Sequence, residues 1–292
     1  MLQVVGRGRE HPAVLVDDDR LCVRHGGGRS LVCARSAHDG RTPRDPQEPM
    51  SPPIRLLHQT VRPFVAAGLR GGIPTPLTAA VPTDAPVGVV PGTDPDRILA
   101  LGGIGGSGVG LRTHAEGVAA QSAKALAAIT GRGVEWRTVP LADQHITATQ
   151  EAVHQITELH RYDVVLVMPG VADALELARI TPWVHRLEDL LDHLVEQTAD
   201  NSVVLVSDVP QVSQYVQAGT FVRGLFRDHA MYLSQRKAEV CARFPQVTSV
   251  KLPDAGPVDF EGGEFRYASM YRRWGEHVGR VIADLQAGRA GA

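Results

Sequence analysis

Side chains that could form a hydrolytic site are spread along the chain after residue 100. The candidates are one serine, three histidines and two acids: Ser107, His114, His145, His229, Asp173 and Glu264. A serine becomes a nucleophile when a histidine accepts its proton and an acid orients that histidine. These residue types allow an esterase or acyltransferase site at Ser107. His145 is the favoured base, because it follows a predicted strand, but no spacing rule unites the residues.

The glycines around Ser107 suggest a second chemistry. Gly103–Gly108 matches the dinucleotide-binding pattern G-x-G-x-x-G. That site also needs an acid roughly 20 positions further on, at the end of the second strand. The nearest acid there, Asp143, comes too late, and no Gly-Lys-Ser/Thr follows to make a P-loop. Nucleotide binding by residues 102–110 therefore stays a weaker alternative.

Metal and disulfide patterns are missing from the sequence. The 12 histidines and 3 cysteines (Cys22, Cys33 and Cys241) include no His-x-x-x-His or Cys-x-x-Cys pair. We expect no metal and no cofactor, and the default is a reduced, cytoplasmic protein. Cys241 falls in an amphipathic stretch and is expected to pack as a small apolar group.

Charge and hydropathy exclude other classes of protein. A formal net charge of -2 gives no electrostatic case for binding nucleic acid. No apolar run approaches the ~20 residues that span a bilayer, so we expect no transmembrane segment. Lysine occurs only at Lys124, Lys237 and Lys251, an arginine-rich bias typical of a high-GC bacterial genome.

The elements that must position these residues alternate regularly from Arg97 onward. Predicted strands cover 97–101, 134–139, 163–168, 202–207 and 247–251, and predicted helices lie near 110–129, 147–160, 182–198, 227–243 and 268–287. Apolar strands alternating with amphipathic helices predict a three-layer α/β domain with a parallel sheet of about five strands. The functional crevice of such a sheet lies beyond the carboxyl ends of its strands.

The residues at these strand ends resemble the bacterial SGNH (GDSL-type) hydrolase family. In that family the first strand ends in Gly-Asp-Ser with Gly-Val-Gly a few residues later, and the third ends in Gly-x-Asn-Asp. Here the first strand is followed by Gly102 and then Gly108-Val109-Gly110, the third by Gly170-Val171-Ala172-Asp173, and the last helix carries Tyr271-Arg272-Arg273-Trp274. The resemblance covers about residues 97–287 and implies a flavodoxin-like sheet order.

The resemblance also implies that the family's catalytic residues are replaced in this chain. The serine position is Ile104, preceded by Gly103, and the catalytic histidine and its aspartate fall at Phe265 and Gly262. The glycine and asparagine that bind the oxyanion fall at His145 and Ala172. Isoleucine cannot attack a carbonyl, phenylalanine cannot accept a proton, and alanine cannot donate to an oxyanion.

We therefore expect a non-catalytic, SGNH-like protein whose former crevice is apolar. Such a crevice would bind a small apolar or acyl ligand, or be filled by its own side chains, and the protein would act by binding a ligand or a partner. The residues expected around it are Ile104, Gly105, Ser107, His145, Ala172, Asp173 and Phe265. Gly170 is expected to make a tight turn, Asp173 to hold the loop backbone, and Tyr271 and Trp274 to pack on the sheet.

The chain before the α/β domain has a different composition. Residues 1–49 contain no aromatic residue, and we expect little order there beyond a weak hairpin at 20–24, with a start of translation at Met50 as an alternative. Residues 50–96 are expected to form an amphipathic helix at 54–70 and an extended linker at 71–96. Residues 288–292 are expected to be a tail.

Overall fold

A computed structural model describes residues 79–211, 220–261 and 264–290, together with the backbone of four N-terminal strands. Those strands form an antiparallel sheet in the order β1-β2-β3-β4. Their bounds are Gln3–Val5 (β1), Val14–Asp17 (β2), Arg20–Arg24 (β3) and Leu31–Arg35 (β4). The expected hairpin strand at 20–24 corresponds to β3, and the predicted helix at 54–70 lies outside the described residues.

The central sheet has six strands in the order β10-β9-β8-β6-β7-β5. Their bounds are Val87–Val90 (β5), Thr93–Leu101 (β6), Arg132–Val139 (β7), Val164–Val167 (β8), Val203–Ser207 (β9) and Val247–Val250 (β10). The strands β6 to β10 are parallel, and β5 pairs antiparallel with β7. Counted along the chain, the parallel strands have the order 2-1-3-4-5, which is the flavodoxin-like order. The fold predicted from the strand pattern and from the resemblance to SGNH hydrolases is confirmed.

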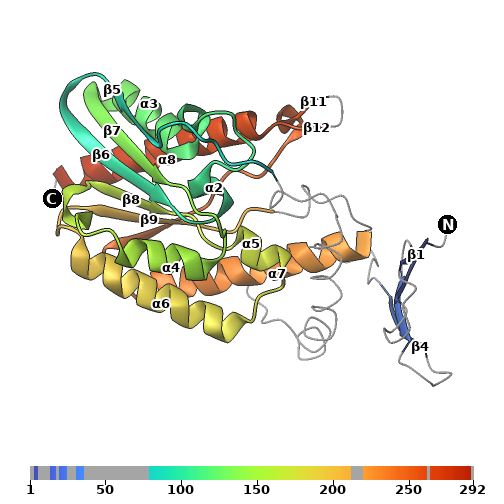
Figure 1. Cartoon of the computed structure of the whole chain (residues 1–292). Helices are drawn as coiled ribbons and strands as arrows, with labels where there is room; N and C mark the ends of the chain where they lie inside the picture. The colour runs from blue at the N-terminus through green and yellow to red at the C-terminus, as the bar shows by residue number, and fades with distance from the viewer. Residues whose placement is uncertain are drawn as a thin grey trace.

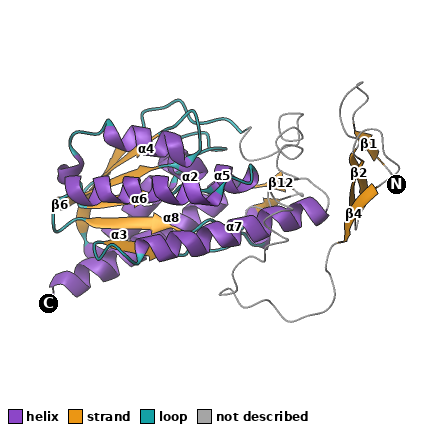
Figure 2. Cartoon of the chain, turned by 90° about the horizontal axis from the view of Figure 1, so that it is seen from below, coloured by secondary structure: helices purple, strands orange, loops and turns teal. Residues whose placement is uncertain are grey.

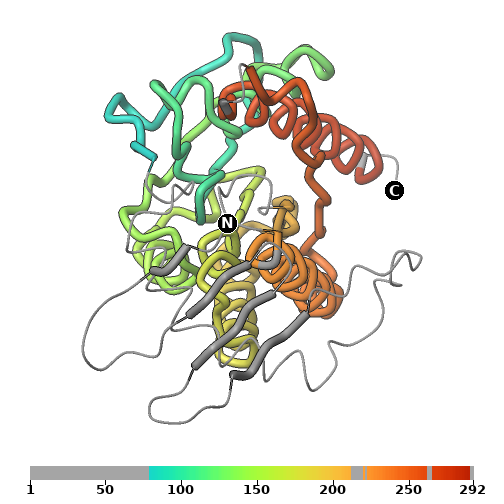
Figure 3. The backbone as a smooth tube through the Cα atoms, turned by 90° about the vertical axis from the view of Figure 1, so that its right-hand side faces the viewer, coloured from blue at the N-terminus to red at the C-terminus, as the bar shows by residue number. Residues whose placement is uncertain are grey.

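Helices cover both faces of this sheet (Figure 1). The helices α3 (Val118–Thr130) and α8 (Tyr267–Ala290) cover one face, and α4 (Ile146–His154), α6 (Ile180–Gln197) and α7 (Thr220–Cys241) cover the other. In the tube view, α8 in red and α7 in orange lie on opposite sides of the chain (Figure 3). The helices α6 and α7 pack against each other (Figure 2).

Burial explains the composition of the sheet. Every residue of Val164–Val167 and of Val203–Ser207 is buried, as expected for parallel strands covered on both faces. Tyr271 and Trp274 on α8 are buried in the cluster on one face, and Cys241 is buried in the cluster on the other. The expected packing of these three residues is confirmed.

Short elements stand where the parallel strands end. The helices α2 (Gly103–Ser107) and α5 (Val171–Leu175) follow β6 and β8, and a hairpin of β11 (Phe260–Glu261) and β12 (Glu264–Phe265) precedes α8. Three short 3₁₀ turns cover His114–Glu116, Leu159–Arg161 and Pro257–Asp259. Within the described part of the chain, no helix is long and apolar enough to cross a bilayer.

Two expected boundaries are wrong. The sequence predicts an extended linker at 71–96, but Val87–Val90 forms the edge strand β5, because the free edge of β7 supplies hydrogen-bond partners to its backbone. Part of the expected tail at 288–292 continues α8 to Ala290. The domain that holds the sheet therefore begins before Arg97.

Candidate functional site

The glycine-rich loop after β6 packs directly against the end of β8. Gly102 and Gly103 have φ values of +88° and +56°, a region that favours glycine. A Cβ atom on Gly103 would lie 2.4 Å from the carbonyl oxygen of Met168. These glycines therefore serve a close approach between two strand ends.

The same loop offers no access to a phosphate. Every residue of Gly103–Ser107 is buried, and the N–H groups of Gly106 and Val109 donate to the carbonyls of Gly102 and Ile104 at 3.0 and 3.2 Å. A phosphate site needs backbone N–H groups that are free and reachable. The geometry thus disfavours nucleotide binding by residues 102–110.

Ile104 and Phe265, which the family resemblance aligns with its serine and histidine, line one apolar space. Its volume is about 10 Å³, close to the minimum that holds one water molecule. The lining residues are Ile104, Val171, Pro210, Phe265, Tyr267, Met270 and Trp274. Burial raises the pKa of Tyr267, the one titratable side chain among them, so its phenol stays neutral. The crevice is therefore apolar and filled by the protein itself.

The surroundings of Ile104 are fixed by α8. The hydroxyl of Tyr271 donates to the carbonyls of Ile104 and Val109, both at 3.0 Å. Ala172, which the family resemblance aligns with the asparagine, is fully buried in α5. Gly262 lies outside the described residues. Gly105 is buried, and a Cβ atom there would lie 2.5 Å from the terminal methyl of Met168, so that side chain would have to shift.

Ser107 has a structural partner in this fold. Its side chain is fully buried, and its Oγ accepts a hydrogen bond from the N–H of Leu141 at 3.1 Å. This bond joins α2 to the loop that follows β7. In the described part of the chain, no hydrogen bond connects Ser107 to a histidine. The Ser107–His145 pair that a relocated site requires is not formed.

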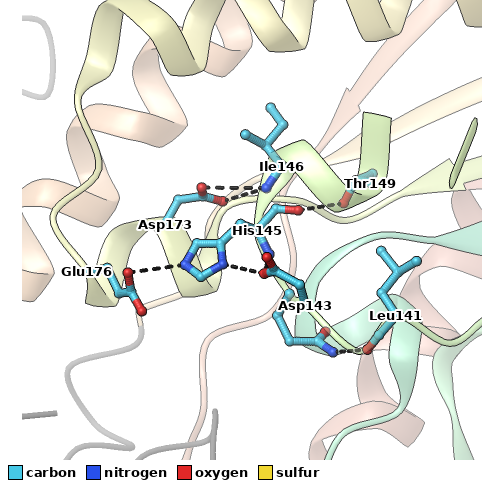
Figure 4. A network of polar contacts seen from close by, with 8 residues as sticks. Leu141, Asp143, His145, Ile146, Thr149, Asp173 and Glu176 are labelled. Atoms are coloured by element: carbon cyan, nitrogen blue, oxygen red, sulfur yellow. Dashed lines mark hydrogen bonds and ion pairs between the residues drawn. The ribbon is translucent and has the colours of Figure 1, made fainter. Parts of the chain in front are cut away.

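His145 lies at the centre of a charged cluster on the loop between β7 and α4 (Figure 4). Its Nδ1 contacts the carboxylate of Asp143, which also accepts the backbone N–H of His145 at 2.9 Å. Its Nε2 lies 3.4 Å from Oε2 of Glu176, on the other side of the ring. Its side chain is 30% exposed, so the ring is half-buried between two acids.

A third acid, Asp173 on α5, lies close to this ring. The carboxylate of Asp173 accepts the backbone N–H of Ile146 at 3.3 and 3.5 Å, at the first residue of α4 (Figure 4). Burial raises the pKa of Asp173. Burial alone would lower the pKa of His145, but the carboxylates of Asp143, Asp173 and Glu176 outweigh it and raise that pKa. These carboxylates favour the protonated form of His145, which is not the form that accepts a proton.

The remaining predicted partners are elsewhere. His114 is buried in a 3₁₀ turn and contacts Asp84 through Nδ1 at 2.8 Å. His229 is buried on α7. Of Glu264 only the backbone, in β12, is described. The structure brings together His145 and Asp173 and separates His114 from them. Gly170, with φ of +117°, makes the expected turn, and Asp173 holds the loop backbone as expected.

Sequence reasoning missed Lys237, a fully buried cation at the strand ends. Its Nζ donates to the carbonyls of Pro169 at 2.5 Å and Ser207 at 2.7 Å, just past β8 and at the end of β9. Burial outweighs the nearby Asp208 and lowers the pKa of Lys237 to about 8. The ammonium group links two strand ends, so its role in the fold is structural.

Comparisons with known proteins give similarities of fold at low identity. No protein-family model and no curated protein matches the chain. A crystal structure of TesA superposes with a TM-score of 0.49 at 14% identity, over 65% of this chain and 99% of TesA. A carbohydrate acetylesterase family member from Sinorhizobium meliloti gives 0.46 at 14%, over 65% and 99% of the two chains. The lipase Lip_vut3 from a goat rumen metagenome gives 0.48 at 13%, over 64% and 97%.

Proposed function

We propose that this chain is a non-catalytic protein on an SGNH-type fold, which acts by binding a partner and not by hydrolysing an ester. One observation carries the proposal. Ile104 and Phe265, which occupy the family's serine and histidine positions, meet in a single apolar space of about 10 Å³. The place where the reaction would occur holds neither a nucleophile nor a base.

The chemistry of acyl transfer makes this replacement decisive. Attack on a carbonyl needs a lone pair that a base can activate, and the alkoxide that forms needs hydrogen-bond donors. Ile104, Ala172 and Phe265 supply none of these from their side chains. A single replacement would leave a variant mechanism open, but here the nucleophile, the base and the amide donor are all replaced.

Size argues for a partner over a small ligand. Ligand pockets hold roughly 300–1,000 Å³, so an acyl chain would enter this crevice only if Phe265 or Met270 moved. Two large apolar side chains, Val258 and Phe260, are 62% and 36% exposed at the hairpin that carries Phe265. These exposed apolar side chains are available for contact with a protein partner.

The alternative enzyme would use Ser107 with His145. The hydroxyl of Ser107 is buried and already accepts the N–H of Leu141, which disfavours that alternative. The assay is the hydrolysis of short-chain nitrophenyl esters by the purified chain, beside Ser107→Ala and His145→Ala variants. We expect all three proteins to match the buffer rate, with the melting temperature showing that each is folded.

If the native chain hydrolyses the ester and Ser107→Ala does not, the proposal is overturned. That result would show that Ser107 has become the nucleophile. A separate thermal-shift measurement with NAD and nucleoside triphosphates tests the glycine loop, because tight binding must raise the melting temperature. We expect no shift from either class of nucleotide.

A further inference from the structure

The central sheet ends at β5, which pairs with β7 on one side and with no other strand of the described chain (Figure 1). Gly88 is directly opposed to Trp136, and a Cβ atom on Gly88 would lie 2.4 Å from that ring, so the indole covers the strand. Val90 packs against the apolar cluster on the same face, under α3 and α8. Because side chains alternate along a strand, Val87 and Val89 point to the other face of β5.

Val87 and Val89 form a bare apolar face at this edge. The two residues are 52% and 65% exposed, and neither belongs to the cluster that α4, α6 and α7 cover. The helix α3, which packs against β5, carries another exposed apolar residue, Ile129. An unpaired edge strand with exposed apolar side chains is a template for pairing with another chain.

The backbone groups of the same two valines face away from the sheet. The carbonyl of Pro86 accepts the N–H of Thr138 on β7 at 2.8 Å. Because the backbone groups of an antiparallel strand alternate in direction, those of Gly88 also face β7. The N–H and C=O groups of Val87 and Val89 therefore point outward, where a further strand can reach them.

We propose that β5 pairs antiparallel with β5 of a second copy of this chain, across a two-fold axis at Gly88. This axis opposes Val87 of each copy to Val89 of the other, and opposed residues of this kind exchange both of their N–H···O bonds. The pairing joins the two central sheets and gathers the valines of both copies on one face. Because both copies use the same strand, the association stops at a dimer.

The ends of the strand select this register. An axis at Val89 would oppose Val87 to Pro91 of the second copy, which has no N–H to donate. An axis at Val87 would oppose Val89 to Ala85, which lies outside β5. Of these three axes, the one at Gly88 alone uses both outward residues of each strand.

Charge on the neighbouring strand favours a second copy in the same register. On the bare face, β7 places Arg137 beside Val87 and Glu135 beside Val89. With the axis at Gly88, the row that begins with Arg137 on one copy ends with Glu135 on the other. Glu135 also keeps its ion pair within its own chain. An axis at either valine would instead place like charges at both ends of the row, which disfavours association.

The test measures self-association of the full chain by sedimentation velocity over a range of concentrations. We expect a monomer–dimer equilibrium without larger species. A variant with Val87→Lys and Val89→Lys places like charges at the junction, so its dissociation constant should rise by about tenfold or more. Met231→Lys is the matched control, because Met231 is 40% exposed on α7. It should change the dissociation constant by less than about twofold, and the melting temperature shows that each variant is folded.

Disulfide trapping tests the register. Two proteins are made with Cys22→Ser, Cys33→Ser and Cys241→Ala, one carrying Val87→Cys and the other Val89→Cys. Opposed positions have Cα atoms about 5.5 Å apart, which a disulfide can join, whereas each position lies about 7–8 Å from its own copy. Mild oxidation of the mixture should trap a heterodimer, and either protein alone should give roughly fivefold less linked dimer or lower still.

Three results would overturn the proposal. The first is a chain that stays monomeric at every concentration, which would leave this edge to a strand of another protein. The second is a dimer that the double lysine variant does not weaken. The third is equal trapping by either cysteine variant alone and by the mixture. None of these results depends on whether the chain hydrolyses esters.

Discussion

The crevice around Ile104 and the polar cluster around His145 both lie where the parallel strands end, yet their composition is opposite. Seven side chains without a charge fill the crevice and leave about 10 Å³. The cluster holds one histidine between the carboxylates of Asp143 and Glu176, with the buried Asp173 nearby. The fold brings strand ends together in both places, but the side chains there decide whether a reaction is possible.

The difference also concerns what each region stabilises. The crevice is part of the apolar core, and its glycines let two strand ends approach closely. The cluster connects the start of α4 to α5 through charged contacts at the surface. Changes in the crevice should therefore alter stability strongly, and changes in the cluster should alter it weakly.

The largest effect is expected from Gly103→Ala. The new Cβ would lie 2.4 Å from the carbonyl oxygen of Met168, at a φ of +56°, so the backbone of two strand ends must shift. We expect the free energy of unfolding, measured with urea, to fall by about 3 kcal/mol or more.

Gly224→Ala is the matched control. Gly224 lies in α7, and a Cβ there would have no atom within 4 Å. Alanine in a helix should raise stability by about 0.5–1 kcal/mol. Native-like stability of Gly103→Ala would contradict the close approach of the loop to β8.

Lys237 should give the next largest effect, as a dependence of stability on pH. Its pKa is about 8 in the folded chain against 10.5 for a free lysine, so between these values the unfolded chain binds the extra proton. Lys237 should raise the free energy of unfolding by about 3 kcal/mol as pH rises across this window, against an opposite contribution from Cys241, whose pKa burial raises to about 11. Urea unfolding of the native chain and of Lys237→Met measures the difference in slope. The same slope in both proteins would show that Lys237 is not the titrating group.

Phe265→Ala tests the filled crevice. Removing the ring enlarges the apolar space beside Ile104, and we expect a loss of about 2 kcal/mol together with new binding of a fluorescent apolar probe. Phe260→Ala is the control, because Phe260 is directly opposed to Phe265 in the hairpin but is 36% exposed. It should cost under about 1 kcal/mol and bind no probe. Equal behaviour of the two variants would mean that Phe265 does not fill the crevice.

The smallest effect is expected from His145→Gln. The pKa of His145 is raised above 6.5, so its ion pairs stabilise the folded chain below that pH and are lost as pH rises through the folded value. Because these groups are half exposed, the contribution should be under about 1 kcal/mol. Stability measured in acid and in mild alkali should differ less in His145→Gln than in the native chain. Exposed His160, replaced by glutamine, is the control, and an equal change there would contradict the assignment.

Most of the sheet could be predicted because strands buried on both faces, such as Val164–Val167, are continuous apolar runs. The edge strand β5 could not be predicted, because the sequence Val-Gly-Val-Val between Pro86 and Pro91 is not a continuous apolar run. Its first residue, Val87, is 52% exposed. An edge strand is defined by its neighbour, which the local sequence does not show.

The crevice could be anticipated from the family resemblance, which placed Ile104 and Phe265 together. The burial of Lys237 could not be predicted, because a lysine in an amphipathic helix normally lies on the solvent face. Only the packing of α7 beneath the ends of β8 and β9 buries it. The pairing of Glu176 with His145 could not be predicted either, because it depends on α5 ending beside the start of α4.

The most direct test of the central claim is labelling with a fluorophosphonate, which reacts with an activated serine whatever its preferred ester. The native chain is incubated with the reagent, and its intact mass is compared with that of Ser107→Ala. A known serine esterase confirms that the reagent is active. We expect an unchanged mass for both forms of the chain, because Ser107 is buried and isoleucine, which the resemblance aligns with the nucleophile at Ile104, cannot react. A single adduct on the native chain that disappears in Ser107→Ala would contradict this account.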